Sequence, residues 1–389
     1  MLDTPYEDRV HRELGPAWIA YAAALGGGAA PDLARPFRYL ELGCGPGASL
    51  IANAAASPHA EFHGCDLSAA HVEAARGEAR ARGLDNLRLH EASFADLLDA
   101  DIGGFDLVVA HGVYSWVDAR ARANVRRLLA TRLNPGGLAY VSYNCQPGWA
   151  AEAPLRRLLV ELAGAGSGSG GERAGQGAAV VDALAGAGLR YFRDTPAAGA
   201  AAAWAARQPP AYLAHEFLNR AWEVFYSIDV QAEMARIGLR YEASATLVDN
   251  YDPLLVNAGQ AAAVAALPTE AARRLAMDFA VNRRFRRDVF SRDAARLAPS
   301  EAAERLAAVT VAAAPGRALE ANLAAPIGEV RFQDAFVRRL EALLGGGPAA
   351  LGALLDGLAA SGDRAAVARN LAYYVALGGL SPCPPPAEG

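Results

Sequence analysis

The chain has 389 residues, with a hydrophobic fraction of 53% and a charged fraction of 20%. These values indicate a globular protein of two or three compact units and exclude a disordered one. The net charge of -5 argues against a general nucleic-acid binder, which would carry a basic excess. All 37 basic residues are arginines, so a lysine Schiff base and a P-loop lysine are excluded.

Apolar residues at three- and four-residue steps predict a helix over residues 6–25, which Pro16 interrupts or restarts. Short apolar strands are then predicted, with helical patterns between most of them. The predicted strands are 37–42, 60–65, 86–90, 105–110 and 138–143, and the predicted helices are 48–57, 69–82 and 119–132. This alternation predicts an α/β fold, a Rossmann-like parallel sheet with helices on both faces.

The pattern beyond this core is less regular. Residues 163–179 are rich in Gly and Ser and predict a linker or a loop. From about residue 300 the chain is rich in Ala and Leu, which predicts helices before a Pro-rich tail. We expect four parts, namely a helical lid at 1–36, a core at 37–160, a helical middle segment at 161–295 that completes the sheet, and an α-rich domain at 296–389.

The four cysteines are widely scattered, at Cys44, Cys65, Cys145 and Cys383. Their spacing predicts neither a zinc site nor a disulfide framework, and we expect no metal. The opening residues are polar and acidic, and no apolar run reaches the roughly 18 residues that a membrane span needs. These features together predict a cytoplasmic protein.

The strongest motif is the turn after the first strand, Glu41-Leu-Gly43-Cys-Gly45-Pro-Gly47. Glycines permit positive φ angles and let a ligand touch the backbone. The carboxylate of Glu41 would repel a pyrophosphate, whereas it favours the ammonium and sulfonium groups of S-adenosylmethionine. A dinucleotide stays an alternative, because Gly43-x-Gly45-x-x-Ala48 also fits the nicotinamide pattern. A tight turn without a ligand is the remaining interpretation.

The ends of the second and third strands add further cofactor candidates. Asp66 closes the second strand, where an acid binds the ribose of either cofactor, and Leu67 follows it. Ser93 and Phe94 follow the third strand, where an adenine would lie. Ser93 is a candidate partner of the adenine amine, while Phe94 fits either the adenine or the core.

The fourth and fifth strands end in segments rich in aromatic and polar residues, His111–Trp116 and Tyr143–Trp149. Ligands of open α/β sheets bind beyond the carboxyl ends of the strands, so these segments predict a substrate pocket beside the cofactor. The candidates for accepting a proton from an attacking amine are His111, which also adjoins the cofactor, Tyr114 and Tyr143. The candidates for substrate contact are Trp116, Asn144 and Trp149. Packing is the alternative role of His111 and of both tryptophans.

Several longer motifs together resemble one bacterial family. They are residues 40–45, 111–117, 140–144, 147–149, 212–218 and 277–286. The family is the class I S-adenosylmethionine-dependent methyltransferases that carry a methyltransferase regulatory domain, and its best understood members are the rickettsial protein lysine methyltransferases. The resemblance covers residues 4–295. It implies S-adenosylmethionine as cofactor, N-methylation of a protein lysine, and an N-terminal lid in which Tyr6 lies near the substrate.

Three alternatives to protein methylation stay open. They are a small-molecule N- or O-methyltransferase, an S-adenosylmethionine-binding accessory protein without activity, and an NAD-dependent oxidoreductase. The acidic balance disfavours a nucleic-acid acceptor, and the oligomeric state is not defined by the sequence. The arginines at 283, 284, 286 and 287 predict a solvated face or, alternatively, a docking surface for an acidic protein.

Overall fold

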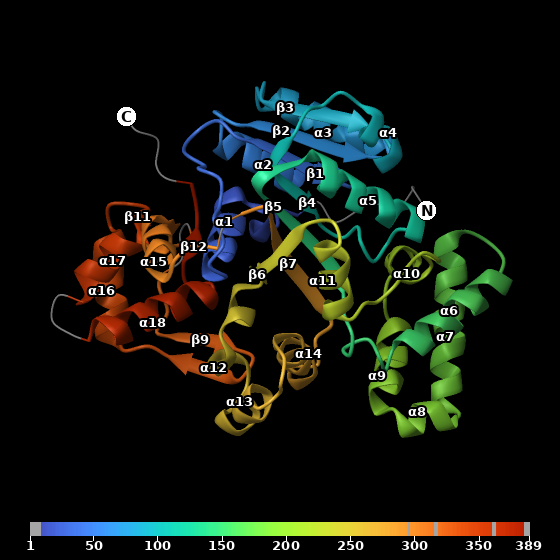
Figure 1. Cartoon of the computed structure of the whole chain (residues 1–389). Coiled ribbons are helices and arrows are strands. Elements are labelled where there is room, and N and C mark those ends of the chain that lie inside the picture. Colours follow the sequence, from blue (N-terminus) through green and yellow to red (C-terminus); the bar gives the residue numbers. More distant parts are fainter. Residues whose placement is uncertain (1–8, 295, 315–317, 360–362, 385–389) are drawn as a thin grey trace.

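In the computed structural model of the chain, the described residues are 9–294, 296–314, 318–359 and 363–384. Their largest element is a mixed seven-stranded sheet with the strand order β3-β2-β1-β4-β5-β7-β6 (Figure 1). The strands are β1 (Arg38–Leu42), β2 (Glu61–Asp66), β3 (Leu87–Glu91), β4 (Phe105–Ala110), β5 (Leu133–Asn144), β6 (Leu239–Ser244) and β7 (Phe285–Arg292). Strands β1 to β5 run parallel, and β7 runs antiparallel to both neighbours. The predicted Rossmann-like α/β fold is confirmed.

Each face of the sheet has its own core, because side chains alternate between the two faces along a strand. The flanking helices are α1 (Pro16–Leu25), α2 (Ala48–Ala56), α3 (Ala69–Ala81), α4 (Phe94–Asp99), α5 (Ala119–Arg132) and α11 (Ser227–Ala235). Tyr39 and Tyr140 belong to the face that packs on α1 and α2. Leu40 and Tyr143 belong to the opposite face, which packs on α4, α5 and α11.

Most predicted boundaries of the core elements lie within one residue of the observed ones, and two differ by more. Residues 6–8 of the predicted helix over 6–25 lie outside the described residues, and within the described part the helix starts at Pro16, after a short 3-10 turn (Arg12–Leu14). Proline suits this first helical position, because the missing N–H has no partner there in any helix. Strand β5 begins at Leu133, five residues before the predicted start, and its ladder with β4 is irregular between Phe105 and Leu107.

Most of the Gly/Ser-rich segment at 163–179 is helical, and only residues 166–169 form a short connection, so the prediction of a linker or loop over the whole segment was wrong. Ser169 caps α7 (Gly170–Gly186) in a reciprocal arrangement with Glu172, which satisfies backbone N–H groups at the helix start. Helix α7 packs on the other helices of a small bundle with its own apolar core, drawn in green in Figure 1. The other helices of this bundle are α6 (Ala153–Ala165), α8 (Arg190–Asp194), α9 (Pro196–Ala205) and α10 (Pro210–Phe217).

The segment between β6 and β7 is helical. Its elements are a 3-10 turn η2 (Leu247–Asn250), α12 (Asp252–Leu255), α13 (Ala258–Ala265) and α14 (Glu270–Ala280). Helix α14 leads directly into β7. The middle part of the chain therefore contributes two strands to the sheet at the edge beyond β5.

The C-terminal part contains helices, as the Ala/Leu pattern predicts, and also two small sheets that the pattern does not indicate. Its helices are α15 (Pro299–Ala308), α16 (Asp334–Leu344), α17 (Leu351–Ala359) and α18 (Arg364–Ala376). Its strands are β8 (Thr310–Ala312), β9 (Asn322–Ala325), β10 (Gly328–Arg331), β11 (Ala349–Ala350) and β12 (Ser381–Pro382). Within the described ranges, every helix is too short or too polar to cross a membrane.

Candidate functional site

The predicted glycine turn joins β1 to α2 at the carboxyl edge of the sheet. Gly43, Gly45 and Gly47 all have positive φ angles, of 70°, 56° and 85°. A side chain at Gly43 would place its Cβ 2.7 Å from the Val113 side chain. The backbone N–H of Gly43 donates to the Cys65 carbonyl at 2.8 Å, which fixes the turn against β2. Glycine is therefore required both by the backbone and by the space available.

Glu41 lies one residue before the end of β1 and is 5% exposed. Its Oε2 atom is buried and has no hydrogen-bond partner. Burial raises the pKa of Glu41 to about 8. Because an unpartnered buried carboxyl group is unfavourable, this atom is suited to a cationic ligand group beside the glycine turn.

Asp66 ends β2 and faces the same turn. Its Oδ2 accepts a hydrogen bond from the Gly45 N–H at 2.9 Å, and its Oδ1 accepts one from the Ser68 N–H at 2.9 Å. Leu67 is 69% exposed although it is apolar. The structure therefore gathers Glu41, Gly45 and Asp66 with Leu67 at one edge, as the sequence predicts.

Ser93 and Phe94 lie at the end of β3, where the sequence predicts an adenine contact. The Ser93 hydroxyl donates to Asp96 Oδ2 at 2.7 Å and accepts from the Asp96 N–H at 3.1 Å, which caps α4. Phe94 is the first residue of α4 and packs partly against the core. Both residues have structural roles of their own, and their contact with a cofactor stays a prediction.

His111 follows β4 and is enclosed by aromatic side chains. A hydrogen bond of 2.9 Å joins its Nδ1 to the Tyr140 hydroxyl. The rings of His11 and Phe285 lie 4.5 and 6.1 Å from the His111 ring. Burial, with a smaller effect from His11, lowers the pKa of His111 to about 3. The imidazole is therefore neutral at physiological pH and is a weak base.

Asn144 lies on the same sheet face as Tyr140, four residues along β5. It is 6% exposed, and its Nδ2 is buried without a hydrogen-bond partner. Asn144 pairs with Phe285 of β7, the residue whose ring contacts His111. The amide donor of Asn144 therefore belongs to the neighbourhood of His111.

Comparisons with known proteins agree with this geometry. A family model described as a methyltransferase domain matches residues 40–139, and one described as a predicted methyltransferase regulatory domain matches residues 209–292. The uncharacterized protein sll1526 of Synechocystis is 30% identical over 355 residues, which cover 91% of this chain and 70% of the relative. The Rickettsia prowazekii protein RP789 is 31% identical over 73% of this chain, which spans about half (51%) of that relative.

This chain belongs to the methyltransferases that carry a regulatory domain. Its fold is also similar to that of PKMT2 from Rickettsia typhi, with a TM-score of 0.72 at 20% identity, covering 97% of this chain and 77% of that chain. The complex of PKMT2 with AdoHcy gives a TM-score of 0.71 at 19% identity over the same shares.

The cofactor of this methyltransferase is S-adenosylmethionine. The residues present fit this group. The unpartnered Glu41 carboxyl suits its ammonium, and the Asp66 carboxyl beside the glycine turn suits its ribose. In the described ranges, no cluster of three or more His, Cys, Asp or Glu side chains is arranged to hold a metal ion.

Two of the predicted proton acceptors of the methyltransferase lie apart from His111. The Tyr143 hydroxyl, on the opposite face of the sheet, donates to Asp288 Oδ2 at 2.6 Å. The Tyr114 hydroxyl donates to Glu233 and accepts from Arg126 at 2.7 Å. Burial raises the pKa of both phenols. Their catalytic role stays a prediction, and both hydroxyls already have polar partners.

The two predicted tryptophans are placed differently in the methyltransferase. Trp149 is 9% exposed, packs edge-on against Trp222 at 5.1 Å, and lies 4.3 Å from the Arg284 guanidinium. Trp116 is half-buried, and its carbonyl accepts from Asn219 Nδ2 at 2.7 Å. Contact with a substrate stays a prediction for both. Tyr6, the predicted lid residue, lies outside the described residues.

Of the arginines at 283, 284, 286 and 287, only Arg284 is exposed, so the prediction that they form a solvated face was wrong. Arg286 is 6% exposed and forms ion pairs with the buried Asp278 and Asp288 at 2.7 and 2.9 Å. Arg283 pairs with Asp249 at 2.7 Å. A strand that enters the sheet carries every second side chain inward, so a run of charges in β7 needs buried partners of opposite sign.

Several residues around His111 are not predicted by the sequence patterns. Glu13 is one of them, and it forms an ion pair of 2.9 Å with Arg287 beside the His111 cluster. Tyr140 belongs to the motif over residues 140–144, from which only Tyr143 is predicted as a proton acceptor. Strict alternation along β5 would have separated Tyr140 and Asn144 from Tyr143. For Glu13 and Arg287, no local signal links positions so far apart in the chain.

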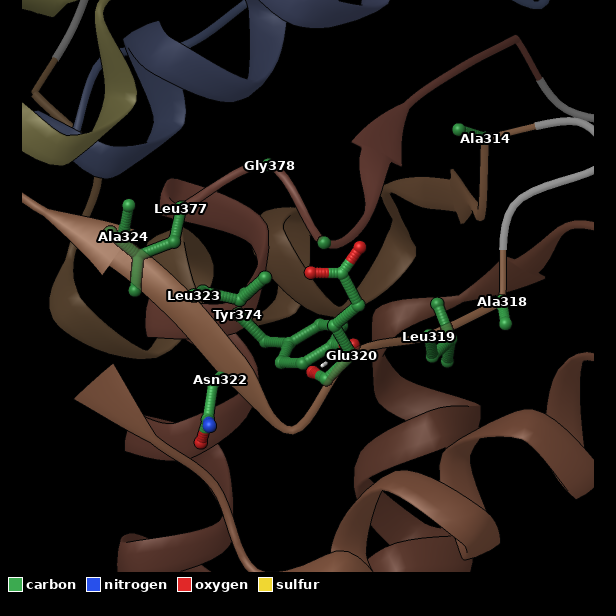
Figure 2. Close-up of a pocket in the computed structure, with 11 residues that line it drawn as sticks. Ala314, Ala318, Leu319, Glu320, Asn322, Leu323, Ala324, Tyr374, Leu377 and Gly378 are labelled. Atoms are coloured by element: carbon green, nitrogen blue, oxygen red, sulfur yellow. Dashed lines mark hydrogen bonds between the residues drawn. The ribbon is translucent and has the colours of Figure 1, made fainter. Parts of the chain in front are cut away.

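A separate cavity of about 250 Å³ lies in the C-terminal part (Figure 2). All of its lining residues come from residues 314–379, and Tyr374 donates to the Glu320 carbonyl at 3.0 Å. The glycine turn and the strand ends of the seven-stranded sheet do not line it. This cavity is therefore not part of the cofactor site.

Proposed function

We propose that this methyltransferase transfers the methyl group of S-adenosylmethionine to the side-chain amine of a lysine in another protein. The cofactor supplies an activated methyl carbon, so the chain has to orient an amine nitrogen and exclude water. The resemblance of the motifs to rickettsial protein lysine methyltransferases supports a protein acceptor. The similarity of the fold to PKMT2 supports it as well.

The observation that carries this proposal is the neutral, enclosed imidazole of His111. A protonated histidine would repel an approaching ammonium group, whereas burial keeps His111 neutral at physiological pH. The rings of Tyr140 and Phe285 lie next to it, and the Phe285 ring already accommodates one cation, the Arg287 guanidinium, at 4.9 Å. We infer that His111 orients the lysine amine, because its low pKa makes it a weak proton acceptor.

We also propose the domain division that the sequence predicts. The two family matches fall inside the proposed core at 37–160 and the proposed middle segment at 161–295. The proposed lid at 1–36 includes His11, whose ring contacts His111, and Glu13, which pairs with Arg287 of β7. These contacts support a role of the N-terminal segment in covering the acceptor amine.

The test is methyl transfer from labelled S-adenosylmethionine into proteins of a cell extract, with and without the enzyme. We expect an enzyme-dependent labelled protein whose hydrolysate contains methylated lysine. The chain contains no lysine. The gel band of the enzyme itself therefore serves as a negative control for lysine methylation. Label that enters only small molecules would contradict the protein acceptor and would favour a small-molecule methyltransferase.

A further inference from the structure

A second hollow, of about 250 Å³, lies where the helical bundle meets the substrate edge of the sheet. One wall is a single face of α6, and the other is the segment that follows α10. The lining residues are Ala153, Arg156, Arg157, Val160, Glu161, Arg220 and Trp222. Three arginines against one glutamate make this hollow basic.

Most of this positive charge is not neutralised by the walls. Arg157 and Glu161 form an ion pair of 2.6 Å with each other, one helical turn apart. In the described part of the chain, Arg156 and Arg220 form no ion pair. Glu216 is not among the lining residues, although its charge acts on Arg156. Two guanidinium groups are therefore available to an anion.

Arg156 is the more unusual of the two, because it is only 6% exposed. Its guanidinium lies 4.2 Å from the centre of the Trp222 ring, and one nitrogen donates to the Asn219 carbonyl at 2.5 Å. Its Nε is buried without a hydrogen-bond partner, and so is Trp222 Nε1. A buried cation with an unused donor is unfavourable unless an anion accompanies it.

The hollow adjoins the loops that the sequence assigns to the substrate. The Trp222 ring packs against Trp149 of the loop after β5. The adjacent Glu223 N–H donates to the Ser115 carbonyl at 2.9 Å, and Asn219 donates to the Trp116 carbonyl. Only the Trp222 ring would therefore separate a group bound in the hollow from the loop after β5, which is predicted to contact the substrate.

We propose that this hollow binds the carboxylate of an aspartate or glutamate that lies near the target lysine in the acceptor protein. This inference rests on the proposed protein acceptor. A planar guanidinium binds a carboxylate through two parallel hydrogen bonds, and two arginines on facing walls suit a single acidic side chain. The hollow would then make the enzyme prefer lysines in acidic surroundings. A free dicarboxylate shares this chemistry, and the experiment separates the two sources.

The probe is a fluorescent synthetic peptide with one lysine flanked by glutamates, and its partner has glutamines in their place. Binding to the full chain is measured by anisotropy with S-adenosylhomocysteine present, so that no methyl transfer is needed. We expect the glutamate peptide to bind at least about tenfold more tightly, as hydrogen bonds to charged groups imply. Arg220→Gln and Arg156→Gln should each remove most of this preference. Arg193→Gln, an exposed residue of α8 in the same bundle, should leave it unchanged.

Equal binding of the two peptides, or a preference that survives in both pocket variants, would overturn the proposal. Arg220 is exposed, so its variant stays informative even where Arg156→Gln fails to fold. Glutarate that binds in an Arg220-dependent way, while the peptide does not, would assign the hollow to a free anion and overturn acceptor docking. An arginine-dependent peptide preference without protein methylation in extracts would uphold the hollow and contradict only the proposed function.

Discussion

Glu41 is the buried side chain that we expect to contact the ammonium group of the cofactor. It lies inside the protein, its Oε2 has no partner, and burial raises its pKa to about 8 against an ordinary value of 4.5. The folded protein therefore keeps a proton on Glu41 over a pH range in which the unfolded chain has released it. Stability contributed by this group is full below pH 4.5 and is lost as the pH rises towards 8.

Glu41→Gln should consequently stabilise the free protein in a pH-dependent way. The variant keeps the size of the side chain and removes its ionisation. We expect its advantage in the free energy of unfolding to grow from about pH 5 to about pH 8, reaching a few kcal/mol, and then to stay constant. Urea unfolding of both proteins across this range measures the difference. Parallel stability curves would show that Glu41 does not titrate in this way.

The same variant should bind S-adenosylmethionine at least about tenfold more weakly, because the ammonium loses its anionic partner. Calorimetric titration at about pH 8 tests this. If the variant is more stable but binds the cofactor less well, then Glu41 lowers the stability of the free protein and strengthens cofactor binding. Unchanged affinity would remove Glu41 from the cofactor site.

Tyr114→Phe distinguishes a catalytic phenol from a structural one. The Tyr114 hydroxyl is held by Glu233 and Arg126, so we expect a stability loss of about 1 kcal/mol. Methyl transfer should stay within about threefold of the wild type, whereas His111→Ala should lower it at least about tenfold. Unfolding curves and initial rates measure the two effects. Loss of transfer in Tyr114→Phe at unchanged stability would restore Tyr114 as the proton acceptor.

At the residue scale, the clustering of the candidate cofactor residues was predictable, and the surroundings of the candidate acceptor residues were only partly so. Glu41, the glycines and Asp66 occur within short motifs whose chemistry is local. The environment of His111 is assembled from His11, Tyr140 and Phe285, which come from three distant segments. Local patterns carry no information on such contacts, although strand alternation would have identified Tyr140.

At the element scale, α7 explains why a glycine-rich composition misled the prediction. Five of its seventeen residues are glycine, which normally disfavours a helix. The Ser169 and Glu172 cap and the packing of Ala174 and Ala178 in the bundle core outweigh this preference. At Gly177, a side chain would meet the Leu159 carbonyl at 3.3 Å, which is a tight contact, so close packing on α6 favours glycine there.

A matched pair of substitutions in α7 tests this explanation. A Cβ at Gly175 would meet only Pro210 atoms, at ordinary contact distances of 3.7 Å or more. Gly175→Ala should therefore stabilise the bundle by about 0.5–1 kcal/mol. Gly177→Ala gains the same helix propensity but brings its Cβ within 3.3 Å of the Leu159 carbonyl of α6, so we expect a smaller net gain. Thermal unfolding followed by circular dichroism compares them, and equal stabilisation by both would refute the packing role of Gly177.

At the scale of the whole molecule, one apolar core combines residues from both ends of the chain, while the bundle between them has a separate core. One core includes Leu14, Tyr39 and Tyr140 together with Val311 and Tyr374 of the C-terminal part. The bundle of α6 to α10 has a core of its own. We therefore expect the C-terminal part to unfold together with the sheet, and the bundle to open separately.

Hydrogen exchange measured by mass spectrometry tests this division. Peptides from β4 and α18 should share one opening free energy, and peptides from α6 and α7 should exchange through a less stable opening. S-Adenosylhomocysteine should slow exchange in β4 and α18 and leave the bundle nearly unchanged, because ligand binding stabilises only the cooperative unit that contains the site. One common opening for all four elements would show that the bundle is not independent.

The position of β5 between β4 and β7 has a consequence for folding during synthesis on the ribosome. The edge of β5 that pairs with β7 stays open until β7 emerges, about 140 residues later. At typical synthesis rates this takes on the order of ten seconds. During that interval the unpaired backbone N–H and C=O groups along one edge of this largely apolar strand can pair with other nascent chains. Such pairing is a known route to aggregation. Expression of this methyltransferase should therefore benefit from slower synthesis or from chaperones that shield exposed strands.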